Sequence, residues 1–272
     1  MPDMPRKHLS CAFTVTLILS GMFQCGYAIA QLLGICMSRN PDYAFTGSFY
    51  NPGPLACYLA VCLPVAIRMM LCGNKFQKPA GMGMVILTVL LIPVTISRTA
   101  IIAGSIGGIV ATSDKWSLKQ LGKAKLLVIG TICMAIAGGI YMVKKNSADG
   151  RLLMWKVATQ AAMEVSLTGA GWSNVAGSYG EAQEKYFASG KGSEQEIIVA
   201  DAPEYVFNEY LQIAIAYGQA AAVIIVVLAA GGVVTAIRNK AYGFAGSTAA
   251  VATVMFASYP LQFPLFVIIT VR

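Results

Sequence analysis

Long apolar runs dominate this chain of 272 residues and limit what it can fold into. Hydrophobic residues make up 57% of the sequence and charged residues only 12%, whereas soluble domains carry about 25% charged residues. A run of about 17 to 25 apolar residues is long enough to cross a bilayer as a helix. We therefore expect an all-α integral membrane protein.

Clusters of charge, proline and glycine divide the apolar runs into about seven predicted transmembrane helices. The predicted spans run from about Leu9 to Met37, Pro54 to Cys72, Ala80 to Ile96, Thr99 to Thr112, Leu126 to Val143, Glu209 to Ile237 and Phe244 to Thr270. We interpret residues 1–272 as a single polytopic membrane domain. One large loop, residues 144–208, is inserted between the fifth and sixth spans.

The third and fourth spans lie in one apolar stretch that contains a single charged residue, Arg98. Pro93 and the break around Arg98 indicate either two short helices or one long, kinked helix. A guanidinium at bilayer depth costs about 3 kcal/mol on insertion scales. We therefore expect Arg98 to bind something negative, and a structural ion pair with a carboxylate is the alternative.

The distribution of charge favours the two short helices. If the third and fourth spans are two separate helices, the basic residues of the short loops fall on one side of the membrane and most acidic residues on the other. The positive-inside rule then places the N-terminus in the cytoplasm and the large loop on the outer side. The net charge of +8 fits orientation signals and contacts with anionic membrane lipids, so nucleic acid is not an expected partner.

The large loop is predicted to start with a turn at Asp149-Gly150 and to continue as an interfacial helix from Arg151 to about Val165. Either this helix only rests on the lipid headgroups, or Arg151 and Lys156 lie at the mouth of a membrane cavity. The glycine-rich stretch that follows is either a flexible surface loop or a backbone that approaches an anion.

Four polar residues mark the point where the chain re-enters the membrane: Glu204, Asn208, Glu209 and Gln212. Asn208 and Gln212 share a helix face by their i, i+4 spacing. Glu209 is either a helix N-terminal residue favoured by the dipole, or a general base or a partner for Arg98.

Several kinds of chemistry lack a necessary residue. The only histidine, His8, lies in the basic N-terminal segment, and the chain has no Walker A sequence. Ser-His proteolysis, histidine-ligated haem and HExxH metalloproteases are therefore excluded. All seven cysteines lie in or beside apolar runs, which indicates neither a disulfide framework nor a zinc site. The cations Arg98, Arg151 and Lys156 suit a phosphate or pyrophosphate at the membrane surface.

Four short segments carry a resemblance to a known family. They are GSFYNPGPLACYLAVCLP, ISRTAIIAG, RLLMWKVATQAAMEVSLTGAGW and VFNEYLQIAIAYG. In this order and topology the chain resembles the O-antigen ligase and polymerase superfamily, over roughly residues 45–218. That superfamily includes O-antigen ligases, O-antigen polymerases and protein O-oligosaccharyltransferases.

The resemblance implies a glycosyltransferase at the periplasmic face of the bacterial inner membrane. A glycan is transferred from undecaprenyl pyrophosphate to a hydroxyl of a glycan, a lipid A-core or a protein, without metal, ATP or another cofactor. By motif position, Arg98 and Arg151 match arginines of the family, and both are expected to stabilise the leaving pyrophosphate. The further candidates are Glu209 as a catalytic residue and Lys156, Glu204, Asn208 and Gln212 as substrate-binding residues.

The chain departs from the family pattern in two ways. Ligases of the family commonly have a His-Asn pair where this chain has Phe207-Asn208. Three explanations stay open. Glu209 or Glu204 is the general base, or the reaction has an oxocarbenium-like transition state that needs little base. In the third, the chain uses another acceptor or none. Family members also have more spans, so we expect a truncated or divergent member.

Three alternatives to a ligase stay open. An O-antigen or exopolysaccharide polymerase belongs to the same superfamily. A transporter-like protein would bind an anionic solute at broken helices, and a non-catalytic membrane protein would use Arg98 only in an ion pair.

Overall fold

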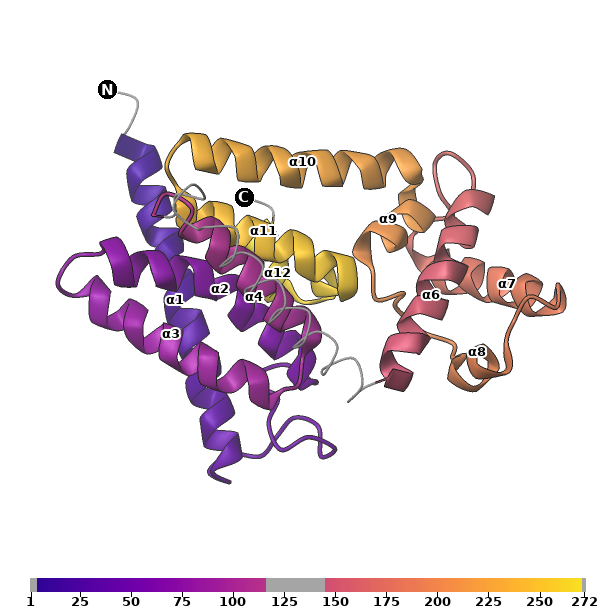
Figure 1. Ribbon diagram of the computed structural model, residues 1–272, viewed down its shortest axis with the longest axis horizontal. Helices are drawn as coiled ribbons and strands as arrows, with labels where there is room; N and C mark the ends of the chain where they lie inside the picture. The colour runs from indigo at the N-terminus through magenta and orange to yellow at the C-terminus, as the bar shows by residue number, and fades with distance from the viewer. Residues whose placement is uncertain (1–3, 116–144, 271–272) are drawn as a thin grey trace, which may run out of the picture. The chain divides into compact units, whose positions relative to one another are not determined.

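The computed structural model describes residues 4–115 and 145–270 (Figure 1). Over these residues the regular structure is entirely helical, without a strand, which confirms the all-α prediction. The chain forms two compact units. Unit 1 comprises residues 1–120 and 232–253, and unit 2 comprises residues 121–231 and 254–272. The prediction of one polytopic membrane domain stays a prediction.

Unit 1 is built around helix α2. Its helices are α1 (Met4–Leu32), α2 (Pro52–Cys72), α3 (Gln77–Val94), α4 (Arg98–Ala111) and most of α11 (Tyr242–Ala257). Asn51 caps α2 by accepting a hydrogen bond from the Gly53 amide at 2.8 Å, and Pro52 occupies the first helical turn, where its missing N–H costs nothing. Residues 54–66 of α2 are all buried, as expected of a helix that is apolar on every face.

Small residues let α2, α4 and α11 approach closely. A Cβ added to Gly107 of α4 would lie 2.8 Å from the Gly246 carbonyl of α11 and 2.7 Å from Pro64 of α2. In the same region the Ser247 hydroxyl donates to the Val61 carbonyl at 2.7 Å. A side chain at either glycine would therefore push these three helices apart.

Two glutamines of α1 hold the loop between α1 and α2. Gln31 Oε1 accepts hydrogen bonds from the amides of Thr46 and Gly47 at 2.9 and 2.8 Å. Gln24 Oε1 accepts from the Ser48 amide at 2.9 Å. Both side chains are buried, and these bonds satisfy polar groups that would be costly to leave unpaired.

The break at Arg98 separates two helices. Helix α3 ends at Val94 and α4 begins at Arg98, with Ile96 between them at a φ of 51°. Ser97 caps α4 through a hydrogen bond from the Ala100 amide. The prediction of two short helices is confirmed, and the alternative of one long, kinked helix is wrong.

Four helical segments of the described chain are long and apolar enough to cross a membrane: Ala12–Leu32, Pro52–Cys72, Gln77–Val94 and Gln219–Arg238. Helices α4 and α11 are apolar but shorter. The described chain is thus that of a multi-pass membrane protein. The predicted fifth span, residues 126–143, lies outside the described residues, and the sidedness of the loops stays a prediction.

Unit 2 contains the large loop and the helices after it. Its elements are α6 (Lys145–Glu164), η1 (Trp172–Asn174), α7 (Val175–Ala188), α8 (Glu194–Val199), α9 (Glu209–Tyr217), the first part of α10 (Gln219–Arg238), the end of α11, η2 (Pro260–Gln262) and α12 (Pro264–Thr270). Its core lies between α6, α7 and α9 and includes Val157, Tyr179 and Ile215.

Two predictions about the large loop are wrong. Helix α6 begins at Lys145 and runs through Asp149-Gly150, because Gly150 is tolerated inside a helix and is buried there. The glycine-rich stretch, residues 168–180, is not a flexible loop in the structure, since it contains η1 and the start of α7. Ser193 starts α8 with a capping box, and Tyr179 of α7 is buried in the core of unit 2.

The sixth and seventh predicted spans are each interrupted. Gly218, at a φ of 87°, ends α9 and separates it from α10, because left-handed backbone cannot continue a helix and favours glycine. Pro260 and Pro264 separate α11, η2 and α12, since proline removes a helical hydrogen bond. The predictions of continuous helices over 209–237 and 244–270 are therefore corrected.

Candidate functional site

Arg151 is held at the surface of unit 2 by three elements. It lies in the second turn of α6, and its guanidinium carbon lies 4.9 Å from the ring centroid of Phe207. Its Nη1 donates to the Ala257 carbonyl at the end of α11 at 3.0 Å. A guanidinium over an aromatic face is attracted by the ring quadrupole. These contacts fix the position of the charge while Arg151 stays half-exposed.

Phe207 adopts an unusual backbone conformation, with a φ of 50°. Its carbonyl accepts a hydrogen bond from the Trp155 indole at 3.2 Å, and its ring meets Tyr259 edge-on at 4.8 Å. A non-glycine residue in this region costs about 1 to 3 kcal/mol and persists only where its surroundings hold it. The strained turn therefore places the Phe207 ring beneath Arg151.

The polar residues around this turn have local partners. Asn208 caps α9 by accepting from the Leu211 amide at 3.1 Å, and Gln212 Oε1 accepts from the Val206 amide at 3.4 Å. Both side chains are buried. Glu204 is exposed and accepts from the Tyr205 hydroxyl at 2.8 Å. Asn208 and Gln212 thus build the turn, and substrate contact by these three residues stays a prediction.

Glu209 is the first residue of α9 and is fully buried, with 0% of its surface exposed. Its Oε1 accepts from the Leu261 amide at 2.8 Å. Its Oε2 has no hydrogen-bond partner among the described residues. Helix α9 lies outside the four candidate spans. Burial raises the pKa of Glu209 to about 7, against the lowering effect of the Leu261 amide, so this carboxyl can exchange a proton near neutral pH.

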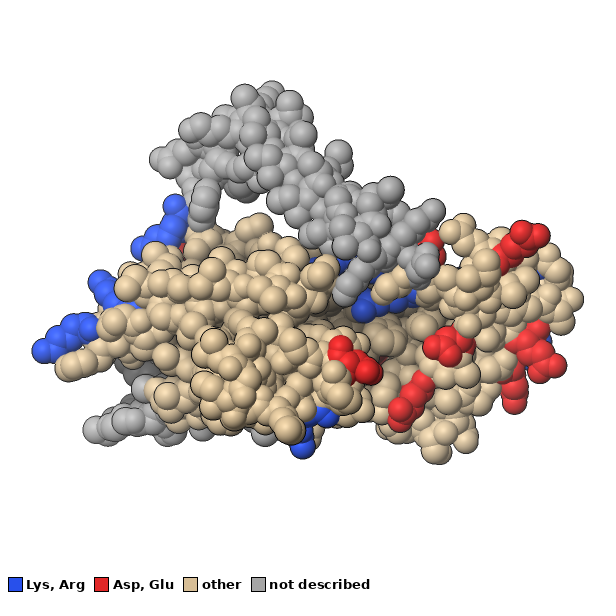
Figure 2. All heavy atoms as spheres, turned by 90° about the horizontal axis from the view of Figure 1, so that it is seen from below, with Lys and Arg blue, Asp and Glu red and all other residues tan. Residues whose placement is uncertain are grey.

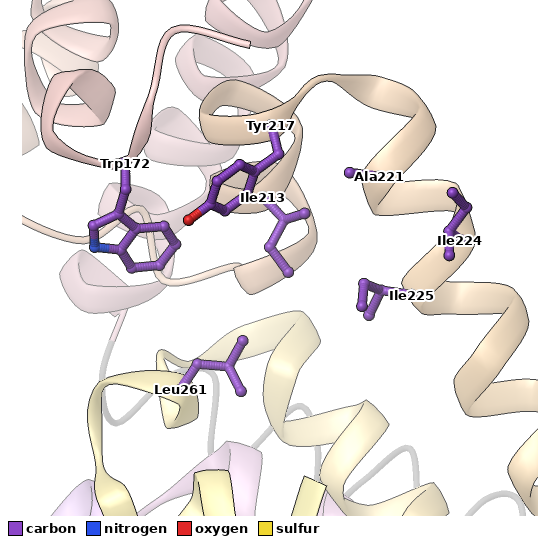
Figure 3. Close-up of a pocket in the computed structure, with 7 residues that line it drawn as sticks. All are labelled: Trp172, Ile213, Tyr217, Ala221, Ile224, Ile225 and Leu261. Atoms are coloured by element: carbon purple, nitrogen blue, oxygen red, sulfur yellow. The ribbon is translucent and has the colours of Figure 1, made fainter. Parts of the chain in front are cut away.

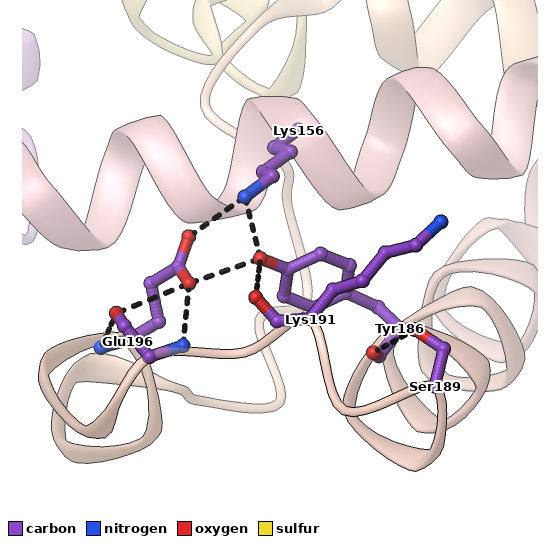
Figure 4. A network of polar contacts seen from close by, with 6 residues as sticks. Lys156, Tyr186, Ser189, Lys191 and Glu196 are labelled. Atoms are coloured by element: carbon purple, nitrogen blue, oxygen red, sulfur yellow. Dashed lines mark hydrogen bonds and ion pairs between the residues drawn. The ribbon is translucent and has the colours of Figure 1, made fainter.

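Lys156 belongs to a polar network that joins α6, α7 and α8 (Figure 4). Its ammonium lies 3.1 Å from Glu196 Oε1 and also donates to the Tyr186 hydroxyl. Glu196 Oε2 accepts from the Tyr186 hydroxyl and from the Ser193 amide, both at 2.9 Å. The Ser193 amide and then Lys156 lower the pKa of Glu196 to about 2. This network holds α8 in place, and substrate binding by Lys156 stays a prediction.

Acidic side chains gather on the exposed surface of unit 2 around α6, α7 and α8. In the view of Figure 2, red carboxylates lie over the part of unit 2 that contains α6 to α8. The exposed acidic residues there include Glu181, Glu184 and Glu194. This surface would repel a pyrophosphate. Arg151, whose guanidinium lies over the Phe207 ring, is a better anion ligand than Lys156, which is paired with Glu196.

Arg98 belongs to unit 1, where it is half-buried at the start of α4. Within the described part of unit 1, no carboxylate pairs with it, and Asp114 instead pairs with Arg68 at 2.6 Å. The positive end of the α4 dipole lies at the same place. Both features favour an anion at Arg98.

No family model, curated protein or solved structure matches this chain.

The residues predicted from the sequence are divided between the two units. In unit 2, one turn connects Arg151 with Glu209, since Phe207 contacts Arg151 and precedes Glu209 by two residues. Arg98 lies in unit 1. The described residues contain no group of three or more side chains suited to a metal ion.

The aromatic residues around Arg151 were missed in the sequence. In the sequence, Phe207 stands out only as the replacement of a histidine, and Tyr259 and Phe256 belong to a predicted apolar span. Trp155 lies against Phe256 at 5.1 Å and bonds to the Phe207 carbonyl. The closely spaced rings in EYVFNEY and MFASYPLQF were the available signal for an aromatic cluster.

Proposed function

We propose that this chain is a glycosyltransferase of the O-antigen ligase type. It transfers a glycan from undecaprenyl pyrophosphate to an acceptor hydroxyl at the periplasmic face of the inner membrane. The observation that carries the proposal is the turn at Phe207, whose ring contacts a positioned guanidinium, Arg151, and which is followed two residues later by a buried carboxyl, Glu209.

The reaction requires a cation and a proton acceptor. The acceptor oxygen attacks the anomeric carbon, the bond from that carbon to the pyrophosphate oxygen breaks, and undecaprenyl pyrophosphate leaves with the electron pair. Negative charge grows on the leaving oxygen, where a guanidinium held in advance stabilises it without reorganising. Arg151 supplies that charge in unit 2. By motif position, Arg98 is also a proposed ligand of the donor, and no carboxylate pairs with it among the described residues of unit 1.

Glu209 is the proposed general base. Phe207 stands where ligases of the family commonly have histidine, and a phenyl ring cannot take a proton. A carboxylate whose pKa is raised to about 7 is a stronger base than an ordinary one and is still ionised in part at neutral pH. The proton of the acceptor hydroxyl goes to Glu209 as the new glycosidic bond forms.

Transfer of a radiolabelled lipid-linked glycan to acceptor in membrane vesicles tests the proposal. We expect Arg98→Ala and Arg151→Ala each to lower the rate by about 100-fold, which is the usual effect of removing one charge-stabilising donor. Lys191→Ala is the matched control, because Lys191 is an exposed cation of unit 2 outside the turn, and its rate should equal that of the wild type. Full transfer by both arginine variants at normal protein levels would refute the function.

A further inference from the structure

Unit 2 contains an apolar pocket of about 530 Å³, here named the Trp172 pocket (Figure 3). Its walls come from η1, α9, the start of α10 and η2. The lining residues are Trp172, Ile213, Tyr217, Ala221, Ile224, Ile225 and Leu261. Neither the candidate site residues nor the proposed reaction uses this pocket.

The lining of the Trp172 pocket selects for hydrocarbon. It contains no charged side chain, and its only side-chain polar groups belong to Trp172 and Tyr217. A sugar or a phosphate placed here would lose its hydration without gaining enough hydrogen bonds, which is unfavourable. A hydrocarbon chain loses nothing on entry and leaves water, which is favourable.

One wall of the pocket belongs to a candidate membrane span. Ala221, Ile224 and Ile225 lie near the start of α10, whose mean hydropathy is 2.6. The neighbouring side chains Val223 and Val227 are exposed. The apolar surface of this helix therefore continues from the pocket wall to the surface that bilayer lipid contacts, and lipid chains can reach the pocket sideways.

Two amphipathic rings flank the same pocket. Trp172 and Tyr217 are stacked, with ring centroids 6.2 Å apart and ring planes at 24°, and Figure 3 shows the Tyr217 ring extending from α9 toward Trp172. Tryptophan and tyrosine are typical of the level where headgroups meet hydrocarbon. This pair therefore indicates where the polar end of a bound lipid lies.

We propose that the Trp172 pocket binds an acyl chain of a membrane glycerophospholipid, with the headgroup at the level of Trp172 and Tyr217. A pocket of this volume suits a small ligand or a chain segment and is too small for a protein partner, whose stable interface buries more than about 1,000 Å². Bulk phospholipid is the most concentrated source of hydrocarbon chains in a bilayer, so mass action favours it over rarer lipids. The proposal does not depend on glycan transfer.

Photolabelling of the full chain in phosphatidylcholine nanodiscs tests this proposal. The probe is a phosphatidylcholine with a diazirine in the middle of one acyl chain, and labelled residues are located by mass spectrometry. Ile213 lines the pocket but is only 6% exposed, so only a chain inside the pocket can reach it. Val227 of α10 is 61% exposed and reports ordinary contact with bilayer lipid.

We expect label on both Ile213 and Val227 in the wild type. Ala221→Phe fills the pocket, so it should lower labelling of Ile213 by at least fivefold and leave Val227 unchanged. Ala220→Phe is the matched control, because Ala220 is exposed and does not line the pocket, and both labels should persist. Ile225→Phe provides a second blocking variant if Ala221→Phe does not fold.

Three results would overturn the proposal. The first is label on Val227 without label on Ile213. The second is Ile213 label that persists in a folded blocking variant. The third is a competition result in which a polyisoprenol at low molar ratio removes the Ile213 label and excess unlabelled phosphatidylcholine does not. That result would make an isoprenoid the occupant of the pocket.

Discussion

At the scale of single residues, the chemistry proposed for unit 2 depends on one turn of three residues. Phe207 contributes a ring and a carbonyl, Asn208 contributes a helix cap, and Glu209 contributes a buried carboxyl. The positive φ of Phe207 is a cost that the contacts of Trp155 and Arg151 offset. The proposed base, Glu209, lies two residues after Phe207 in the chain.

The pH dependence of turnover follows from Glu209. Its pKa is raised to about 7 by burial, and the base must be ionised to accept a proton. We expect the transfer rate to fall as pH decreases through about 7 and to reach a plateau above it. Glu209→Gln, which keeps the shape and cannot ionise, should lower turnover by at least about 100-fold and leave donor binding nearly unchanged. A pH profile without a step near 7, or full turnover in Glu209→Gln, would return Glu209 to a helix-end role.

The same pKa shift predicts how folding stability changes with pH. The pKa of Glu209 is higher in the folded state than the ordinary value of 4.5, so protonation favours folding. Its contribution to stability is fully present below about pH 4.5 and is lost as pH rises through about 7. The side chain in Glu209→Gln does not ionise. The unfolding temperature of this variant minus that of the wild type, both measured in detergent, should therefore increase from pH 5 to pH 8. An equal pH dependence in both proteins would contradict the burial of an ionisable group here.

At the scale of elements, hydrophobicity in the sequence predicts where helices lie. It does not predict the helix ends that glycine and proline set inside the sixth and seventh apolar runs. The end of α3 and the start of α4 were predicted within three residues, because Pro93 and Ser97 are ordinary stop and start signals. The breaks in the sixth and seventh spans were missed, since an apolar run looks the same whether the helix continues or reverses. At Gly218, whose positive φ ends α9, an added Cβ would lie 2.0 Å from the Leu167 carbonyl, and no local pattern reveals this close approach.

The candidate site shows the same division. The sequence alone indicates three candidate site residues, Arg98, Arg151 and Glu209. A charged residue in or beside an apolar run is costly to place there, so it can be recognised as a candidate without a structure. The contact of Arg151 with Phe207 and the bond from Leu261 to Glu209 join residues more than 50 positions apart. Such pairs depend on tertiary packing, so they could not be predicted from spacing.

Gly218 tests the break between α9 and α10. A Cβ at this position would lie 2.0 Å from the Leu167 carbonyl, at a φ of 87°. We therefore expect Gly218→Ala to destabilise unit 2 by more than about 1 kcal/mol, measured as a lower unfolding temperature. Gly231→Ala is the matched control, because nothing lies within 4 Å of the added Cβ and alanine is favourable inside a helix. Equal unfolding temperatures for the two variants would contradict this backbone crossing.

Helix α8 is expected to depend on Glu196. Its carboxylate is bound by Lys156, Tyr186 and the Ser193 amide. Glu196→Ala should therefore increase amide hydrogen exchange across residues 194–199 by about tenfold or more, while Glu194→Ala, which removes an exposed carboxylate of the same helix, should change it little. Equal exchange in the two variants would show that the network does not hold α8.

At the scale of the whole molecule, the four long apolar helical segments make the chain a multi-pass membrane protein. The positive-inside rule predicts a cytoplasmic connection between α2 and α3 and an outer location for α7 and α8. In a cysteine-free background, we expect Lys191→Cys to react with a membrane-impermeant maleimide added outside, and Lys75→Cys to react only after the membrane is opened. The reverse pattern would invert the topology and move the proposed reaction to the cytoplasmic face.

The most direct test of the central claim is the affinity of the purified chain for undecaprenyl pyrophosphate, compared with undecaprenyl monophosphate. If Arg151 binds the donor pyrophosphate, the wild type should prefer the pyrophosphate, and Arg151→Ala should weaken its binding by at least about tenfold, or about 1.4 kcal/mol. Lys191→Ala should bind as the wild type does. Equal affinity for the two lipids, unchanged in Arg151→Ala, would contradict the account.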